Sequence, residues 1–147
     1  MSRWNRRDRR SHKRLDTGHL KLSVMPRRTA AAFDPIETIL RTIETTGDID
    51  AAGDTPIFKT PWSHEWFELA PSLHGFVDVY DLHAQISGRE MPTGPLRQLA
   101  NKFKYGVMIF PSDIDLVRES LQILRVETMS MTLNYVDTLI QSIKEVA

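Results

Sequence analysis

The chain has 147 residues, no cysteine and a formal net charge of zero. This length predicts one domain with an appendage. The lack of cysteine excludes disulfides and thiolate sites within the chain and favours a reducing compartment, so we expect a cytoplasmic protein. No uninterrupted apolar run approaches the roughly 20 residues that a membrane-spanning helix needs, and we therefore expect no membrane span.

The net charge of zero conceals two oppositely charged parts. Residues 1–28 carry ten Lys or Arg and two Asp, a net charge of +8. The remaining residues carry nine basic and seventeen acidic side chains, a net charge of −8. Because the two parts cancel in the total, the asymmetry bears on the partners of this chain and the overall charge does not.

The basic part predicts an Arg-rich N-terminal arm over residues 1–30, followed by an acidic α-helical domain over residues 31–147. Few apolar residues accompany the charges of the arm, so we expect it to be flexible when free. Arginine presents a planar, always-charged fork to phosphate, and an aromatic side chain can stack on a base. The predicted nucleic-acid-binding residues are Arg3, Trp4, Arg6, Arg7, Arg9, Arg10, Lys13 and Arg14.

Four other interpretations of the arm stay open. It can be a solubilising tail, or a segment that folds back on the acidic domain. It can also be a targeting segment, or one that contacts an anionic membrane surface. Asp8 and Asp16 count against a transit peptide, because such peptides are poor in acidic residues.

The first expected helix begins at Asp34-Pro35. Asp34 suits the N-cap, Pro35 suits the first helical position because its missing N–H costs nothing there, and Glu37 completes a capping box. Gly47 predicts the end of this helix. One apolar face is formed by Ile36, Ile39, Leu40 and Ile43.

Residues 47–60 are expected to form a polar loop. Their alternating acidic residues suggest a calcium loop, but Ala52 and Lys59 stand where that motif needs ligands. Thr60-Pro61 then predicts a short helix that ends at Pro71. Its apolar face, formed by Trp62, Trp66 and Leu69, is expected to pack in the core.

Two further helices are expected, from Ser72 to Gly88 and from Gly94-Pro95 to Gly106. The connection between them is too long for a DNA-binding helix-turn-helix. The apolar run at residues 107–110 is expected to be a buried connector. The second helix carries a candidate secondary basic face for phosphate, with a solvated helix surface as the alternative: Arg97, Lys102 and Lys104.

Residues 111–147 predict the helical scaffold on which the shorter helices pack. Ser112 is the expected N-cap. The apolar residues fall in two stripes that are out of phase, so the region is either one long helix or two helices with a turn near residues 127–132, which Thr128, Ser130 and Thr132 favour. The second stripe is a candidate interface with a partner or a second copy: Met129, Leu133, Val136, Ile140 and Ile143.

Two acidic-histidine groups raise the possibility of a metal site or a small hydrolase: His64, Glu65 and Glu68, and His74, Asp78 and Asp81. The chain has no HExxH pattern, no order of residues typical of a catalytic triad and no glycine-rich phosphate loop. We therefore predict no metal, no cofactor and no enzymatic activity. His83 is expected on the surface.

These observations predict an all-α fold, a small bundle of five to six helices behind a basic arm. The predicted function is a non-enzymatic assembly or scaffolding protein that binds RNA or DNA without sequence specificity, while the helical body docks a protein partner or another copy as a homo-oligomer. Small virion-associated proteins share this plan, as an analogy only. The alternative is a protein-interaction adaptor or inhibitor that works through the acidic body.

Overall fold

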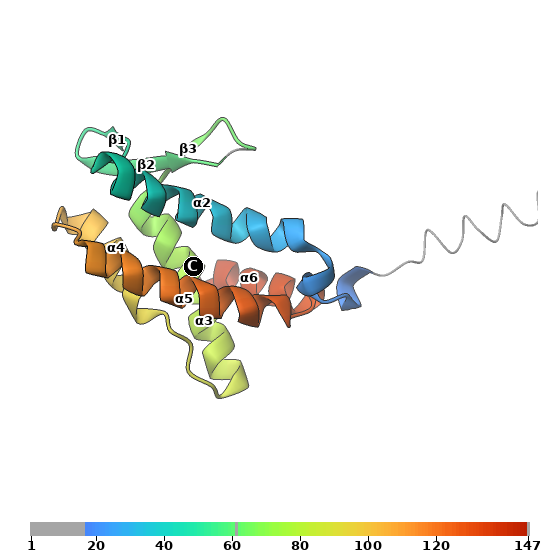
Figure 1. The fold of residues 1–147 in the computed structure, drawn as a ribbon. Helices are drawn as coiled ribbons and strands as arrows, with labels where there is room; N and C mark the ends of the chain where they lie inside the picture. Colours follow the sequence, from blue (N-terminus) through green and yellow to red (C-terminus); the bar gives the residue numbers. More distant parts are fainter. Residues whose placement is uncertain (1–16, 61, 147) are drawn as a thin grey trace, which may run out of the picture.

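The computed structural model describes residues 17–60 and 62–146. These residues form five α-helices and one small antiparallel sheet (Figure 1). The helical part of the predicted fold is confirmed, and the sheet is an addition to it. The helices are α2 (Pro26–Thr46), α3 (Leu69–Ser87), α4 (Gly94–Tyr105), α5 (Pro111–Met129) and α6 (Leu133–Val146).

Helix α2 begins at Pro26, so the predicted start at Asp34-Pro35 is wrong. Pro26 occupies the first turn, where a proline is tolerated, and Pro35 lies inside the helix. A proline in a helix interior removes one backbone hydrogen bond. The sequence therefore favoured a helix that starts at Pro35 over one that contains it. The end of α2 is as predicted, because Gly47 adopts the left-handed conformation with φ of 70°.

The segment before α2 is attached to the turn between α5 and α6. Leu22 N–H donates to the Met131 carbonyl at 2.9 Å, and Leu133 N–H donates to the Leu20 carbonyl at 3.1 Å. The Leu22 side chain is buried. Residues 17–25 therefore pack on the helical body, and the boundary that we predicted at residue 30 falls inside α2.

Residues 51–68 contain the three-stranded sheet instead of the predicted loop and short helix. Its strands are β1 (Ala51–Ala52), β2 (Thr55–Lys59) and β3 (Trp66–Glu68), in the order β1-β2-β3. In the β2–β3 pairing, Phe58 lies opposite Phe67 and Lys59 lies opposite Trp66. The predicted helix over residues 60–70 is thus wrong, because cross-strand pairing determines the backbone there.

Helix α3 contacts all four other helices. Phe76 packs edge-on against Phe33 of α2, with ring centroids 5.3 Å apart. Tyr80 and His83 form hydrogen bonds with α5, and His83 also contacts α6. Arg97 of α4 forms ion pairs with two α3 carboxylates. Residues 111–147, the predicted scaffold, also contact every other helix, since α5 packs on α2 and α4 while α6 packs on α3.

The C-terminal region forms two helices, as Thr128, Ser130 and Thr132 favoured. Helix α5 ends at Met129 and α6 begins at Leu133. The predicted N-cap at Ser112 is wrong, because α5 starts at Pro111 and the Asp113 carboxylate accepts the Phe110 N–H at 2.7 Å. Helices α2 and α5 run antiparallel, since Arg118 pairs with Glu44 and Arg125 pairs with Asp34.

The core lies where α2, α3, α4 and α5 meet. Its fully buried side chains include Leu40, Val77, Leu96 and Leu124. Trp62 and Trp66, which we expected in this core, are 63% and 51% exposed. They lie in or beside the short sheet, where Trp66 stands opposite the exposed Lys59 and not opposite Phe58, the β2 residue that packs against the core.

The connector at residues 107–110 is exposed rather than buried. Val107, Met108 and Phe110 are each more than half exposed, and so is Tyr105 just before them. Only Ile109 packs partly against the core. The prediction of a buried connector is wrong, because α4 and α5 meet each other directly and the link between them runs along the outside.

Candidate nucleic-acid interface

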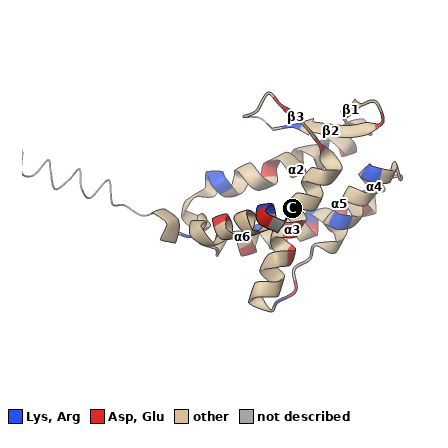
Figure 2. Ribbon diagram, turned by 180° about the vertical axis from the view of Figure 1, so that it is seen from behind, with Lys and Arg blue, Asp and Glu red and all other residues tan. Residues whose placement is uncertain are grey.

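The Lys and Arg residues of the predicted arm that lie in the described part of the chain are Lys21, Arg27 and Arg28, which we call the root cluster. All three side chains are exposed. They lie at or just before the start of α2 (Figure 2). None of them forms an ion pair with a carboxylate of residues 17–60 or 62–146. Their charge is therefore available to an anionic partner.

Most cations elsewhere on the body are neutralised by carboxylates. Arg125 contacts Asp34 at 3.1 Å, and Arg118 contacts both Glu37 and Glu44. The hydrogen bond with Glu44 raises the pKa of Arg118, and the same contact lowers the pKa of the Glu44 carboxyl. Such pairs are partly exposed and individually weak, but they leave little uncompensated positive charge on this side of the body.

The predicted secondary basic face is largely occupied by contacts within the chain. Arg97 lies 2.9 Å from Asp78 and 2.6 Å from Asp81. Lys102 lies 2.7 Å from Asp113 and also over the Phe110 ring, while Lys104 lies over the Tyr105 ring. The Lys102 hydrogen bond and the Phe110 N–H together lower the pKa of Asp113. Of the three residues, only Lys104 has no carboxylate partner among the described residues.

Exposed acidic side chains gather at the other end of α2, around the sheet (Figure 2). They lie in the loop before β1, in the β1–β2 turn and beside β3. None of them forms an ion pair within residues 17–60 and 62–146. A helix of 21 residues is about 31 Å long at 1.5 Å per residue, so the root cluster and the acidic group are well separated. The group comprises Asp48, Asp50, Asp54, Glu65 and Glu68.

The predicted interface stripe lies around the α5–α6 turn and along α6, and its side chains are only partly exposed. Ile140 is 39% exposed, whereas Met129, Leu133, Val136 and Ile143 are half-buried. The most buried α6 residue is Leu139, at 1% exposed, which lies outside the predicted stripe. The other predicted residues, Arg3 to Arg14 with Trp4, lie outside the described part of the chain.

A hydrogen-bonded cluster that we did not predict joins α3, α5 and α6. His83 is 6% exposed, so its predicted surface position is wrong. Its Nε2 lies 2.8 Å from Glu127 Oε1, and its Nδ1 lies 2.6 Å from the Tyr135 hydroxyl. Arg89 also contacts the Glu127 carboxylate. Hydrogen bonds from Arg89 and then His83 lower the pKa of Glu127, so this carboxylate accepts while His83 Nε2–H donates.

The order hydroxyl, imidazole, carboxylate in this cluster is also the order found in nucleophilic catalysis. However, burial and the nearby Glu127 charge raise the pKa of Tyr135, which disfavours a nucleophilic phenolate. No cavity of the described structure that we identified is lined by His83 or Tyr135. The hydrogen bonds of this cluster fix α3 against the two C-terminal helices.

The two acidic-histidine groups do not converge on a metal. Arg97 lies among His74, Asp78 and Asp81, with its guanidinium 2.9 Å from His74 Nδ1. Within residues 17–60 and 62–146, no group of three or more His, Cys, Asp or Glu is arranged to hold a metal ion. No helix in the same ranges is long and apolar enough to span a membrane.

Comparison with known proteins adds no relative: no protein-family model matches the chain, and no significant match was found among curated proteins or solved structures.

Proposed function

We propose that this protein is a non-enzymatic, nucleic-acid-associated assembly protein whose N-terminal cations bind phosphates. The observation that carries the proposal is the separation of charge. The root cluster of Lys21, Arg27 and Arg28 has no carboxylate partner among the described residues, and it continues the Arg-rich sequence of residues 3–14. By contrast, five of the nine cations after residue 28 form ion pairs with carboxylates.

Binding through such cations would be mostly insensitive to base sequence. Each phosphate that a Lys or Arg neutralises releases condensed counterions, and this term supplies nearly all of non-specific affinity. Trp4 would add base stacking on single strands. The acidic group around the sheet would repel nucleic acid, so that the bound strand stays at the root cluster.

The test is an affinity measurement on the full chain with a short single-stranded RNA. In the first variant the seven basic residues from Arg3 to Arg14 are replaced by Gln, and we expect binding to be nearly lost. In the second, Arg27→Gln and Arg28→Gln are combined, and we expect a clear weakening. The matched control combines Arg41→Gln and Lys144→Gln, which removes the same charge from exposed positions away from the root cluster. Equal weakening by the second variant and its control would contradict a localised phosphate site.

For the assembly part of the proposal, the end of α4 and the loop after it, residues 105–110, offer an exposed apolar surface. Tyr105 and Met108 are each 69% exposed, and Val107 and Phe110 are each 52% exposed. Four large apolar side chains exposed within six residues are typical of an interaction surface. We propose that a second copy of the chain docks there, rather than on the half-buried stripe of α6.

Light scattering after size-exclusion chromatography tests this docking. Met108→Asp places a charge in the loop without touching the core, because Met108 is mostly exposed. We expect the wild-type protein to self-associate and the variant to be monomeric. The control is Ile86→Asp, which places the same charge at an isolated apolar residue that is 60% exposed near the end of α3. If the wild-type protein is monomeric, docking of a second copy at this loop is contradicted and the adaptor alternative is supported.

A further inference from the structure

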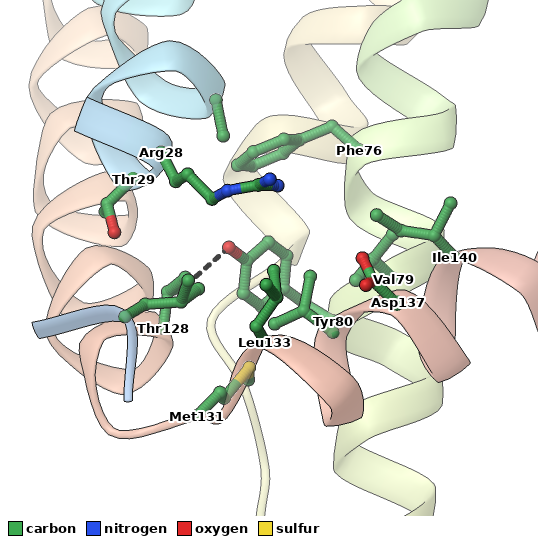
Figure 3. A pocket seen from close by; sticks show the side chains of 13 residues that line it. Arg28, Thr29, Phe76, Val79, Tyr80, Thr128, Met131, Leu133, Asp137 and Ile140 are labelled. Carbon is green, nitrogen blue, oxygen red and sulfur yellow. Dashed lines mark hydrogen bonds between the residues drawn. The ribbon is translucent and has the colours of Figure 1, made fainter. Parts of the chain in front are cut away.

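A cavity of about 230 Å³ opens between the start of α2, the middle of α3 and the first two turns of α6 (Figure 3). Most of its lining is aliphatic or aromatic, with Tyr80 and Thr128 joined by a hydrogen bond at its wall. Its apolar lining residues include Leu22, Phe76, Val79, Met131, Val136 and Ile140. Three members of the predicted stripe, Leu133, Val136 and Ile140, therefore border a cavity instead of a flat interface.

Two charged side chains of opposite sign also line this cavity. The Arg28 side chain extends from α2 across the opening, with its guanidinium beside the Phe76 ring (Figure 3). Asp137 comes from α6 on the other side. Neither residue forms an ion pair with any described side chain. A charge held over an apolar cavity without a partner suits a ligand that has one charged end and one apolar end.

The surroundings of the two charges favour an anionic ligand over a cationic one. Arg28 stands in the first turn of α2, at the positive end of the dipole of a 21-residue helix. Lys21 and Arg27 lie close to Arg28 in sequence and are likewise without carboxylate partners among the described residues. Asp137 has no comparable acidic neighbour in the lining of the cavity. Lys21, Arg27, Arg28 and Asp137 together therefore carry more positive than negative charge around the opening.

The volume limits the apolar part of the ligand to a short chain. At about 30 Å³ of liquid volume per water, the cavity corresponds to roughly eight water molecules. A methylene group is of similar size, so a chain of comparable length fills the space. Drug-sized ligands usually occupy larger pockets of about 300–1,000 Å³.

We propose that this cavity binds a medium-chain aliphatic carboxylate, with the chain between α3 and α6 and the carboxylate at the Arg28 guanidinium. The proposal does not depend on nucleic-acid binding. Arg28 takes part in both, but the apolar lining serves only the carboxylate ligand.

Calorimetric titration of the full chain with hexanoate, octanoate and decanoate tests the proposal. We expect saturable binding that strengthens about fourfold for each methylene group that becomes buried. Decyltrimethylammonium, which carries the opposite charge on the same chain, is expected to bind more weakly than decanoate. The proposal is overturned if decanoate fails to saturate a site or if the cationic probe binds more tightly.

Paired variants locate the ligand. Ala32 lines the cavity and is exposed, so Ala32→Phe is expected to block the opening and abolish decanoate binding, while Ala31→Phe, at an exposed neighbour that does not line this cavity, retains it. Arg28→Gln is expected to weaken decanoate binding by about two- to fivefold, since the guanidinium is partly solvated. Arg27→Gln, which removes the same charge one residue away from the cavity lining, should weaken it much less than Arg28→Gln. Decanoate binding that survives Ala32→Phe, or that responds equally to both arginine variants, would overturn the assignment.

Discussion

Tyr80 on α3 donates a hydrogen bond to Thr128 on α5, 48 positions further along the chain, across a buried contact of 2.6 Å. The direction follows from the second bond of Thr128, whose hydroxyl donates to the Leu124 carbonyl at 2.7 Å. A hydroxyl has one hydrogen, so its oxygen can only accept from Tyr80. This bond joins the central helix to the C-terminal pair at the wall of the cavity.

The two ends of this bond should differ in their cost on mutation. Tyr80→Phe removes the donor and leaves Thr128 still bonded to Leu124, so we expect a loss of about 1 kcal/mol in the free energy of unfolding. Thr128→Val removes the acceptor and leaves the buried Tyr80 hydroxyl unsatisfied, which costs about 1–3 kcal/mol. Urea unfolding of both variants measures the difference. A larger loss for Tyr80→Phe would mean that the donor assignment is reversed.

The same tyrosine predicts a loss of stability in alkali. Burial raises the pKa of Tyr80 from 10.0 to about 12. Because the folded state binds the phenolic proton more tightly than the unfolded chain, stability is unaffected below pH 10 and falls as pH rises toward 12. Each pKa unit corresponds to about 1.4 kcal/mol, so the loss approaches roughly 3 kcal/mol. In Tyr80→Phe this part of the decline should be absent, and an unchanged alkaline profile in that variant would contradict it.

Glu127 predicts a loss of stability as the pH falls into the acidic range. Arg89 and His83 lower the pKa of its carboxyl below the ordinary value of 4.5. This group therefore stabilises the fold above pH 4.5, and its contribution disappears as pH falls through the lowered value. Glu127→Gln, which keeps an acceptor for His83, should flatten this acidic part of the stability profile. Asp115→Asn on the same helix is the control, since Asp115 is exposed and forms no ion pair with a described residue. The two variants should differ below pH 4.5.

The exposed tryptophans should matter little for stability. Trp62 is 63% exposed and Phe33 is 1% exposed. We expect Trp62→Ala to change the free energy of unfolding by about 0.5 kcal/mol or less, whereas Phe33→Ala should cost about 3–5 kcal/mol. Thermal unfolding compares them directly. A large loss for Trp62→Ala would show that this side chain is covered in solution, as it would be in a self-associated protein.

The α4 basic face and the root cluster should differ in RNA binding, because Arg97 on α4 is paired with carboxylates and, among the described residues, Arg28 is not. Arg97 is engaged by Asp78 and Asp81, and although burial opposes its charge, these hydrogen bonds raise its pKa. We expect Arg97→Gln to leave RNA affinity unchanged within a factor of about two, while Arg28→Gln lowers it. Equal losses for the two variants would restore the α4 face as a phosphate site.

Local signals in the sequence were sufficient where a helix ends at a glycine or changes its apolar face. The stops at Gly47, Gly88 and Gly106 and the turn between α5 and α6 follow from backbone conformation and side-chain periodicity, which neighbouring residues determine. The sheet could not be predicted in this way. Its strands of two, five and three residues are stabilised by pairing such as Phe58 with Phe67, and pairing is not a local property.

The candidate sites also combine features visible in the local sequence with features that depend on the fold. The +8 and −8 charges are visible in composition, but the neutralisation of Arg97 depends on α3 and α4 lying side by side. Arg28 and Asp137 are more than 100 positions apart, so the cavity that they border appears only when α2 and α6 are placed together. His83 gave no signal, because a lone histidine between apolar residues is equally common on a surface.

The measurement that bears most directly on the central claim is the salt dependence of single-stranded RNA binding by the full chain and by the variant with Gln at the seven basic positions from Arg3 to Arg14. For the wild type we expect the logarithm of affinity to fall linearly with the logarithm of salt concentration, with a slope of about −0.7 for each phosphate contact. The variant should show a much shallower slope. If the wild type fails to bind at low salt, or if both proteins share one slope, the N-terminal cations do not bind nucleic acid and the proposed function is contradicted.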